Sequence, residues 1–323
     1  MEIRITRAHR VFSDGRHNAF TSINRLSQNT YIAFRSASSH VSYDGQIVLI
    51  GSSDLNSWHE VARFADAKYD CRDPKLVLFQ NRMLLYFGAR PQNGLIEPRG
   101  RVFSDNNNET SFVLQGIPVG SWLWSVASWR GELYGCAYAR GAISLYTSSD
   151  GLHWRKLLDF SIPGNETAID FGDDDTLWAL VRNDAGGCIP SVCQLKPPYR
   201  EISSILRLPI RLQGPMMKRL PGGCVIVCRR WNMPGRRNLR TDMFWLKDDH
   251  EIQYGGTFPS GGDTSYASWL DVEPGKAVMS YYLAHEHKMD QPCGQDHAED
   301  KAWAEHTSPA DIFLADISYA DAV

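Results

Sequence analysis

A two-part unit of roughly 45 to 50 residues recurs along the whole chain, and this repeat constrains the fold more than any other feature. Each unit opens with an apolar run, turns at a short polar step, and continues in a second apolar run. Short runs of this kind predict β-strands. A repeat of this period is typical of a β-propeller, in which each four-stranded sheet buries its faces against its neighbours. The unit is clearest at 74–87, 125–135, 168–181 and 215–227.

Counting the first strand of each unit predicts an all-β chain, a six-bladed propeller that forms a single domain over residues 1–323. The N-terminal run 2–12 is expected to supply the outer strand of the sixth blade, so that N- and C-terminal strands close the ring and cover two strand edges. Little helix is expected outside 285–309, a predicted rim loop or lid with a short helix at 298–305. The blades are expected near 18–60, 72–115, 122–160, 166–207, 214–255 and 263–318.

Composition excludes several classes of function. A formal net charge of -3 and the absence of a basic run argue against nucleic acid as a partner. The N-terminus has no apolar segment, and no run of about 18 apolar residues occurs, so we expect a cytoplasmic protein without a membrane partner. The seven cysteines are expected to be mostly buried free thiols. Histidines at 285, 287, 297 and 306 match no standard metal spacing, so neither a metal nor another cofactor is expected.

The polar residues of the repeat fall at two phases, the start of each first strand and the end of each second strand. In a propeller, both phases lie on one face of the central funnel, where arginines, a few carboxylates and many aromatic residues would meet. Guanidinium groups bind carboxylates in bidentate fashion, so this combination suits a carbohydrate partner that carries a carboxylate. The first phase contributes His17, Arg72, Asp73, Trp122, Trp124, Glu166, Gln213, Asp263 and Tyr266, and the second Arg35, His40, Arg90, Tyr138, Arg140, Arg182, residues 229–237, Tyr281, Tyr282 and His285.

Two turns carry a local motif, at 52–58 and 148–154, with a weaker relative at 104–106. In each, Ser and Asp side chains can accept backbone N–H groups while a Trp packs the turn onto the blade. The motif resembles the Asp-box, or BNR repeat, of the sialidase (neuraminidase) superfamily. Both boxes lack one spacer residue, and the first also lacks the glycine. In that family the boxes join third and fourth strands on the face opposite the active site, which implies structural roles for Asp54 and Asp150.

The second half of the chain resembles the catalytic segments of the same superfamily. Glu166-Thr167-Ala168-Ile169-Asp170, followed by a strand that ends in Arg182-Asn183, is similar to one pattern, and Arg236-Arg237-Asn238-Leu239 and Ser265-Tyr266-Ala267-Ser268 are similar to two others. These segments occur in family order. The resemblance implies a retaining exo-glycosidase in which Tyr266 attacks the anomeric carbon and Glu166 takes its proton, an exception to the two-carboxylate rule. It further implies that Arg182 and Arg236 hold a substrate carboxylate.

The first half departs from the family pattern. His17-Asn18-Ala19-Phe20 stands where sialidases have Arg-Ile-Pro, and Arg35 stands where they carry the acid/base Asp. Arg35 and Arg72 could complete the arginine cluster, with Asp263 as a further substrate-binding residue. Asp73, His40 and Asp44, in that order, are the candidates for the acid.

Three functions therefore stay open. The first is a sialidase-like hydrolase of a terminal acidic sugar. The second is a glycosidase or lyase for another acidic, uronic-type sugar, with Asp73 or His40 as the acid. The third is a propeller that binds carbohydrate or protein without catalysis.

Overall fold

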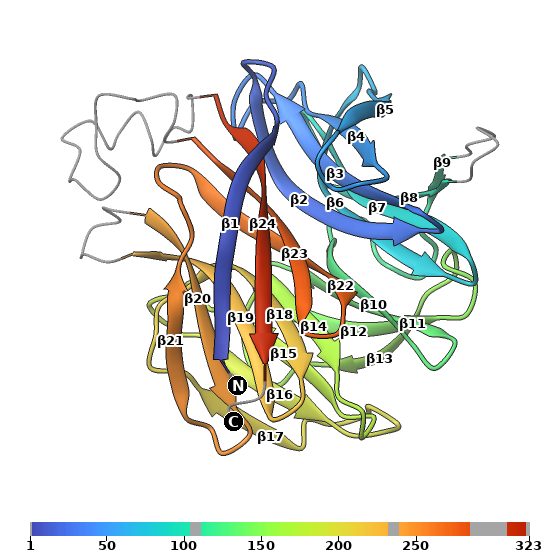
Figure 1. Cartoon of the computed structure of the whole chain (residues 1–323). Helices are drawn as coiled ribbons and strands as arrows, with labels where there is room; N and C mark the ends of the chain where they lie inside the picture. The colour runs from blue at the N-terminus through green and yellow to red at the C-terminus, as the bar shows by residue number, and fades with distance from the viewer. Residues whose placement is uncertain (1, 104–110, 232–238, 285–308, 321–323) are drawn as a thin grey trace.

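The structure is a computed structural model, and it describes residues 2–103, 111–231, 239–284 and 309–320. These residues form six four-stranded antiparallel sheets arranged as the blades of a propeller, and no helix occurs among them (Figure 1). None of the described segments therefore has the helical length and apolar character that crossing a membrane requires. The predicted fold class is confirmed. The expected lid at 285–309 and its helix at 298–305 lie outside the described residues, apart from 309 itself.

Each blade runs outward from a first strand that faces the central axis. Blade one consists of β2 (His17–Leu26), β3 (Asn29–Ala37), β4 (Gln46–Ser52) and β5 (His59–Phe64). Blade two consists of β6 (Tyr69–Phe79), β7 (Arg82–Pro91), β8 (Glu97–Phe103) and β9 (Ser111–Val113). Blade three consists of β10 (Trp122–Trp129), β11 (Glu132–Ala139), β12 (Ala142–Ser148) and β13 (Arg155–Asp159). Blade four consists of β14 (Thr167–Phe171), β15 (Leu177–Val181), β16 (Ser191–Leu195) and β17 (Ser204–Arg207). Blade five consists of β18 (Gln213–Leu220), β19 (Gly223–Trp231), β20 (Leu239–Lys247) and β21 (Ile252–Thr257).

The sixth blade is built from both ends of the chain. Its order is β22 (Thr264–Glu273), β23 (Lys276–Leu283), β24 (Asp311–Ala320) and β1 (Glu2–Phe12). β1 pairs antiparallel with β24 along its whole length, and Figure 1 shows the two strands side by side with the termini close together. The ring is therefore closed by N- and C-terminal strands, as the sequence predicts, and the outer edge of β24 is covered.

Six hydrophobic clusters fill the spaces between neighbouring blades. For example, Ala33, Leu49 and Leu85 pack between blades one and two, while Met243 and Met279 pack between blades five and six. Six of the seven cysteines are described, and all six are buried, as expected. Because both faces of the middle strands are covered, the blades bury apolar side chains on both sides.

Five of the six first strands carry a β-bulge at one recurring place, and β14 does not. The pairing with the second strand shifts between Ala19 and Ser22 in β2, and it shifts at matching places in β6, β10, β18 and β22. Phe20, Asp73, Gly214 and Tyr266 have φ angles between 50° and 61° there. Left-handed backbone is uncommon for residues other than glycine, and bulges re-aim side chains beside active sites. The bulges therefore determine which side chains face the axis at the level where the candidate site lies.

The two Asp-containing turns have the structural role that the sequence implies. Asp54 Oδ1 accepts the N–H groups of Asn56 and Ser57, at 2.8 and 2.7 Å. These hydrogen bonds, with that from Ser57 largest, lower the pKa of Asp54 to about 2. The corresponding turn at Asp150 joins β12 to β13, just as that at Asp54 joins β4 to β5. Both turns therefore lie at the ends of third strands, on the face opposite the starts of the first strands.

Candidate active site

Blades four, five and six bring a tyrosine, a glutamate and an arginine into direct contact. Tyr266, at the bulge of β22, donates its hydroxyl hydrogen bond to Glu166 Oε1 at 3.0 Å. Arg182, one residue beyond β15, places Nη1 2.5 Å from Glu166 Oε2 and 3.5 Å from the Tyr266 hydroxyl. The Gly214 N–H donates to Glu166 Oε2 at 3.0 Å. The glutamate is thus fixed by three donors, and one of them is the phenol.

Gly214 allows this approach because it has no side chain. A Cβ at this position would lie 3.1 Å from ring carbons of Tyr266, and the residue has a φ of +55°. Both constraints favour glycine over any other residue. This glycine was not singled out from the sequence, because nothing in a linear pattern shows that the backbone of blade five touches a ring from blade six.

Burial determines the protonation state of the phenol. Desolvation raises the pKa of Tyr266 and the Glu166 carboxylate adds to the effect, while Arg229 and Arg182 oppose it. The pKa of Tyr266 stays above its usual value, so the hydroxyl is neutral near pH 7 and holds a proton that Glu166 can accept. This pair has the geometry of a nucleophile with its base.

The arginines around the pair are already braced by the protein. Arg182 uses Nε and Nη2 in a bidentate pair with Asp184, at 2.9 Å each. Arg229, in β19, donates to Asp263 at 3.1 Å and to Gln213 at 3.0 Å, and its guanidinium lies 5.5 Å from the Tyr266 ring centroid. The sequence placed Arg229 only within a range of candidates, while Arg236, which it named, lies outside the described residues.

Arg72 and Asp73 join this group from blade two. The Arg72 guanidinium lies over the rings of Phe20 and Trp122, 5.2 and 5.9 Å from their centroids. Its Nε has no hydrogen-bond partner among the described residues, and it lies 3.9 Å from Asp73 Oδ2. The Asp73 charge contributes to the raised pKa of Tyr266, which places the two side chains in one electrostatic environment. Arg72 thus packs on Phe20, whose ring contacts that of Tyr266, and the roles that the sequence suggests for Arg72 and Asp73 stay predictions.

The surroundings of Asp73 favour the protonated form of its carboxyl group, as a general acid requires. Desolvation raises the pKa of its carboxyl group, and the charge of Glu166 adds to this, while Arg72 and Lys75 oppose it. The side chain of Asp73 is only 6% exposed, and no described residue donates a hydrogen bond to its carboxylate. A buried carboxyl group without donors keeps its proton to higher pH than an exposed one.

Arg35 does not lie in the site, in contrast to its prediction as a substrate-binding residue. Its side chain is fully buried, and its donors reach Asp70 Oδ1 at 2.8 Å and the carbonyl oxygens of Ser39 and Ser42 at 2.9 and 2.8 Å. The reason is its place in the interior of β3, paired with both neighbouring strands, where the pleat directs the side chain into the protein. Arg35 thus holds the loop that carries His40.

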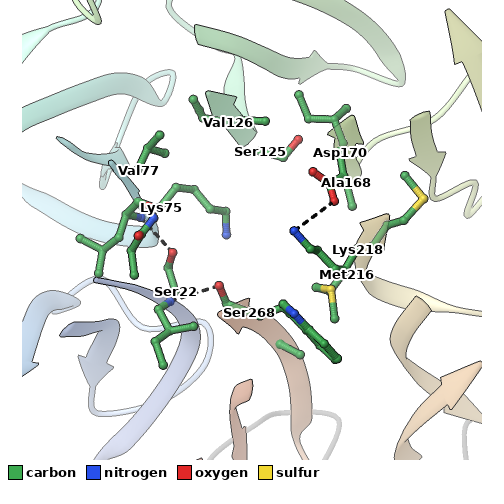
Figure 2. Close-up of a pocket in the computed structure, with 18 of the residues that line it drawn as sticks. Ser22, Lys75, Val77, Ser125, Val126, Ala168, Asp170, Met216, Lys218 and Ser268 are labelled. Atoms are coloured by element: carbon green, nitrogen blue, oxygen red, sulfur yellow. Dashed lines mark hydrogen bonds and ion pairs between the residues drawn. The ribbon is translucent and has the colours of Figure 1, made fainter. Parts of the chain in front are cut away.

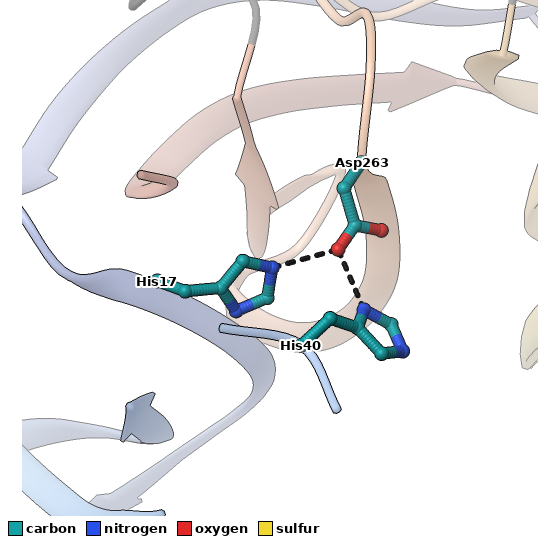
Figure 3. A group of neighbouring side chains, drawn as sticks. All are labelled: His17, His40 and Asp263. Carbon is teal, nitrogen blue, oxygen red and sulfur yellow. Dashed lines mark hydrogen bonds and ion pairs between the residues drawn. The ribbon is translucent and has the colours of Figure 1, made fainter. Parts of the chain in front are cut away.

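His40 belongs to a hydrogen-bonded cluster centred on Asp263 (Figure 3). His40 Nδ1 and His17 Nε2 both contact Asp263 Oδ2, at 2.6 and 2.7 Å. The other carboxylate oxygen accepts hydrogen bonds from the Tyr282 hydroxyl at 2.8 Å and from Arg229 at 3.1 Å. Asp263 is only 2% exposed. Four donors from the described residues therefore hold the carboxylate, and through them Asp263 connects His17, His40, Tyr282 and Arg229. Its predicted role as a substrate-binding residue stays a prediction.

The same cluster is a candidate metal centre, which the sequence analysis did not anticipate. One ligand atom from each of His17, His40 and Asp263 lies within 4.8 Å of the others. The surroundings favour hydrogen bonds over a cation, however. Metal on His17 Nε2 would move the ring proton to Nδ1, which is buried without an acceptor. The Arg229 guanidinium already occupies the other side of Asp263. The donor set does not fit a resident metal ion.

Two further predictions for the acid differ in outcome. Asp44 is exposed, and its pKa is lowered to about 2 because hydrogen bonds from Ser42, Ser38 and Arg16 outweigh desolvation, the largest single influence. A carboxyl group with that pKa is ionised near neutrality, so Asp44 is unsuited to donate a proton. His40 lies beside Phe20, which in turn contacts Tyr266, with ring centroids 5.0 Å apart in each pair. His40 therefore borders the site. The histidines at 285, 287, 297 and 306 lie outside the described residues.

Comparisons with known proteins support the fold. No family model matches the chain, and no curated protein matches its sequence. Among solved structures, a protein of unknown function from Dyadobacter fermentans is similar over 98% of this chain and 99% of its own, with a TM-score of 0.77 and 13% identity. The endosialidase of phage phi92 covers 98% of this chain and 70% of its own, with a TM-score of 0.70 and 10% identity. NanB sialidase from Streptococcus pneumoniae is similar over 95% of this chain and 70% of its own, with a TM-score of 0.68 and 9% identity. The structural neighbours of this chain thus include sialidase and endosialidase propellers, at low sequence identity.

Proposed function

We propose that this protein is a glycoside hydrolase of the sialidase type, which removes a terminal sugar that carries a carboxylate. The observation that carries the proposal is the hydrogen bond between the Tyr266 hydroxyl and Glu166 inside a ring of arginines. Sialidases and other glycoside hydrolases among the structural neighbours support the same class of reaction. One neighbour, the sialidase of Trypanosoma rangeli, is described as a covalent intermediate with 2,3-difluorosialic acid.

The first step of the reaction follows from the neutral phenol. Tyr266 Oη forms a bond to the anomeric carbon while Glu166 takes the phenolic proton, and the bond to the leaving group breaks. A neutral nucleophile suits a carbon that bears a carboxylate, because an anionic nucleophile would be repelled. The oxygen of a water then bonds to the anomeric carbon as the glycosyl-tyrosine bond breaks. The water gives one proton to the Asp73 carboxylate, and the proton held by Glu166 returns to the phenolate oxygen. The guanidinium groups of Arg182, Arg72 and Arg229 lie around the pair and supply the positive charge that would attract a substrate carboxylate.

Asp73 is the acid that protonates the leaving group in this scheme. Asp73→Asn should lower kcat for a glycoside with a poor, alkyl leaving group by about 100-fold or more, the usual scale of general acid catalysis. Asparagine tolerates the left-handed backbone at this bulge, so the fold should be retained. An aryl glycoside with an acidic phenol needs little protonation and should lose far less activity.

The pH profile supplies a second readout for Asp73. Because the pKa of its carboxyl group is raised, wild-type activity on the alkyl glycoside should persist above the usual range of an aspartate and then fall as the proton is lost. Asp73→Asn should lack this basic limb. If His40→Gln removes the limb while Asp73→Asn keeps it, His40 is the acid and the assignment of Asp73 is wrong.

The substrate is tested by a panel of aryl glycosides of sialic acid, other nonulosonic acids and uronic acids. The proposal predicts hydrolysis of a nonulosonic acid glycoside, with release of the phenol. Hydrolysis confined to uronic acids, or an unsaturated product, would favour the alternative glycosidase or lyase. Saturable glycan binding without any product would favour the noncatalytic propeller.

A further inference from the structure

A cavity lies along the axis of the propeller and adjoins the candidate active site at Tyr266. It has a volume of about 350 Å³ and is lined by the first strands of all six blades. The candidate site uses the starts and bulges of these strands, whereas the cavity is lined mainly by the residues that follow the bulges, toward the face with the Asp54 and Asp150 turns. Trp124 and Tyr266 border it at the bulge level. We call this cavity the axial channel.

The wall of the axial channel is rich in hydroxyl groups. Ser22 Oγ accepts the Leu76 N–H at 2.9 Å, and Ser268 Oγ accepts the Ile23 N–H at 3.1 Å, so each serine links two neighbouring blades. A hydroxyl that accepts one hydrogen bond still has its own proton to donate. Figure 2 shows Ser22 and Ser268 next to each other on the wall of the channel, and Ser22 is hydrogen-bonded to Leu76, the residue after Lys75. This side of the wall can therefore offer donors to a bound group.

Two lysines point into the axial channel from opposite sides, as Figure 2 shows for Lys75 and Lys218. Lys218 Nζ is balanced by carboxylates, at 3.1 Å from Asp271 and 3.8 Å from Asp170. Lys75 Nζ instead lies 4.7 Å from the Trp124 ring centroid. No carboxylate of the described residues lies within ion-pair distance of it. Asp170 and Asp271 match Lys75 and Lys218 in number, but both carboxylates lie beside Lys218, and the Lys75 ammonium group is left without one.

The environment of Lys75 is unfavourable for its charge. The channel reaches the side chain, but the surrounding protein removes much of its hydration, and this desolvation lowers the pKa of the ammonium group. The charges of Asp73 and Glu166 oppose the effect from a distance. A desolvated charge without an anionic partner is costly, and an anion in the channel would relieve that cost.

We propose that the axial channel binds a small inorganic anion between Lys75 and Lys218, with the hydroxyl groups of Ser22 and Ser268 as further donors. The Lys75 ammonium group, which has no carboxylate partner among the described residues, supplies the charge, and the serines supply directed hydrogen bonds from neighbouring blades. Halide and phosphate share this chemistry, because each offers a compact negative charge to several donors at once.

The anion would also act on the candidate active site, a consequence that rests on the proposed function. Lys75 follows Asp73 by two residues in β6, across the bulge, and its positive charge lowers the pKa of the Asp73 carboxyl group. An anion beside Lys75 would offset that charge, so the pKa of Asp73 would rise. The acid would then keep its proton to higher pH, and the basic limb of the activity profile would move upward.

Crystals of the full chain soaked in bromide test the site directly through anomalous scattering. We expect a bromide peak beside Lys75 Nζ in the wild type, its loss in Lys75→Met, and its retention in Lys156→Met. Methionine keeps the length of the side chain without the charge. Lys156 is a matched control because it is exposed and pairs with Asp159 away from the channel. No peak in the channel, or one that Lys75→Met leaves unchanged, would overturn the proposal.

Solution measurements extend the test without requiring activity. Phosphate titrated into the wild type should give saturable heat and a higher Tm, and both effects should be lost in Lys75→Met but kept in Lys156→Met. Equal effects in all three proteins would overturn the proposal. If the channel binds anions but no glycoside is hydrolysed, the anion site stands and the proposed function fails. If hydrolysis occurs but bromide does not shift the basic limb of the pH–activity profile, the proposed effect of the anion on Asp73 is wrong.

Discussion

Tyr266→Phe should lower kcat for glycoside hydrolysis by about 1,000-fold or more, because the variant has no oxygen to bond to the anomeric carbon. The ring stays in place between Phe20 and Trp124, with which it makes edge contacts at 5.0 and 5.6 Å. Glu166 keeps its contacts with Arg182 and the Gly214 N–H. The fold should therefore be retained, and the loss should appear in kcat, measured with the best substrate of the panel.

Tyr86→Phe is the matched control for this variant. Tyr86 is fully buried, and its hydroxyl donates one hydrogen bond to the Gly151 carbonyl at 3.0 Å, in another part of the ring. It should lose about 1 kcal/mol of stability, the usual net value of such a bond, and keep its activity. If Tyr266→Phe retains wild-type kcat, or if Tyr86→Phe loses activity to the same degree, Tyr266 is not the nucleophile.

Arg35→Met should lower the free energy of unfolding by about 3–5 kcal/mol, the scale for breaking a buried ion pair by removing one partner. The variant leaves Asp70 fully buried beside Arg72 and Arg90 with one cation fewer. It also removes the donors that hold the carbonyl oxygens of Ser39 and Ser42. Urea unfolding followed by circular dichroism measures the loss.

Arg4→Met removes a surface ion pair and serves as the comparison. Arg4 and Glu2 lie 2.6 Å apart, but their side chains are 68% and 63% exposed, so the loss should stay below about 1 kcal/mol. Gly45→Ala gives an independent view of the buried pair, because a Cβ there would lie 1.9 Å from Asp70 Oδ1 and 2.4 Å from Arg35 Nε. Arg35→Met with the stability of Arg4→Met would show that Arg35 is not a structural residue.

The fold could be predicted from the sequence because its signals are local. Two apolar runs per unit show where strands begin and end, and the turns at Asp54 and Asp150 are built from side chains that bond to their own backbone. Closure of the ring by residues 2–12 also follows from counting strands, since the sixth blade would otherwise lack its outer strand. The pairing of β1 with β24 confirms it.

The site could be predicted only in part. Whether a residue stands at the start or the end of a strand shows how far along the propeller axis it lies, but it does not show where its side chain points. Arg35, Arg182 and Arg229 share one phase, yet Arg35 points into the protein from the interior of β3, while Arg182 lies just beyond β15 beside Glu166. The bulges at Asp73 and Tyr266 change the direction again.

Contacts between distant segments account for the remaining differences. The pair of Arg35 and Asp70 depends on Gly45, and the pair of His17 and Asp263 joins residues 246 positions apart. Neither pair leaves a pattern in a single sequence. For such residues the sequence shows only the residue type and the position along the propeller axis. This was enough to nominate Tyr266 and Glu166 as candidates, but it did not distinguish Arg35 from Arg229.

A mechanism-based inactivator tests the central claim most directly. A 2,3-difluoro derivative of the acidic sugar that the panel identifies should trap the glycosyl-enzyme, because fluorine beside the anomeric centre slows the second step. Mass spectrometry of the digested protein should then find one sugar on the peptide that contains Tyr266, and none on Tyr266→Phe. An adduct on any other residue, or turnover without an adduct on Tyr266, would contradict the account.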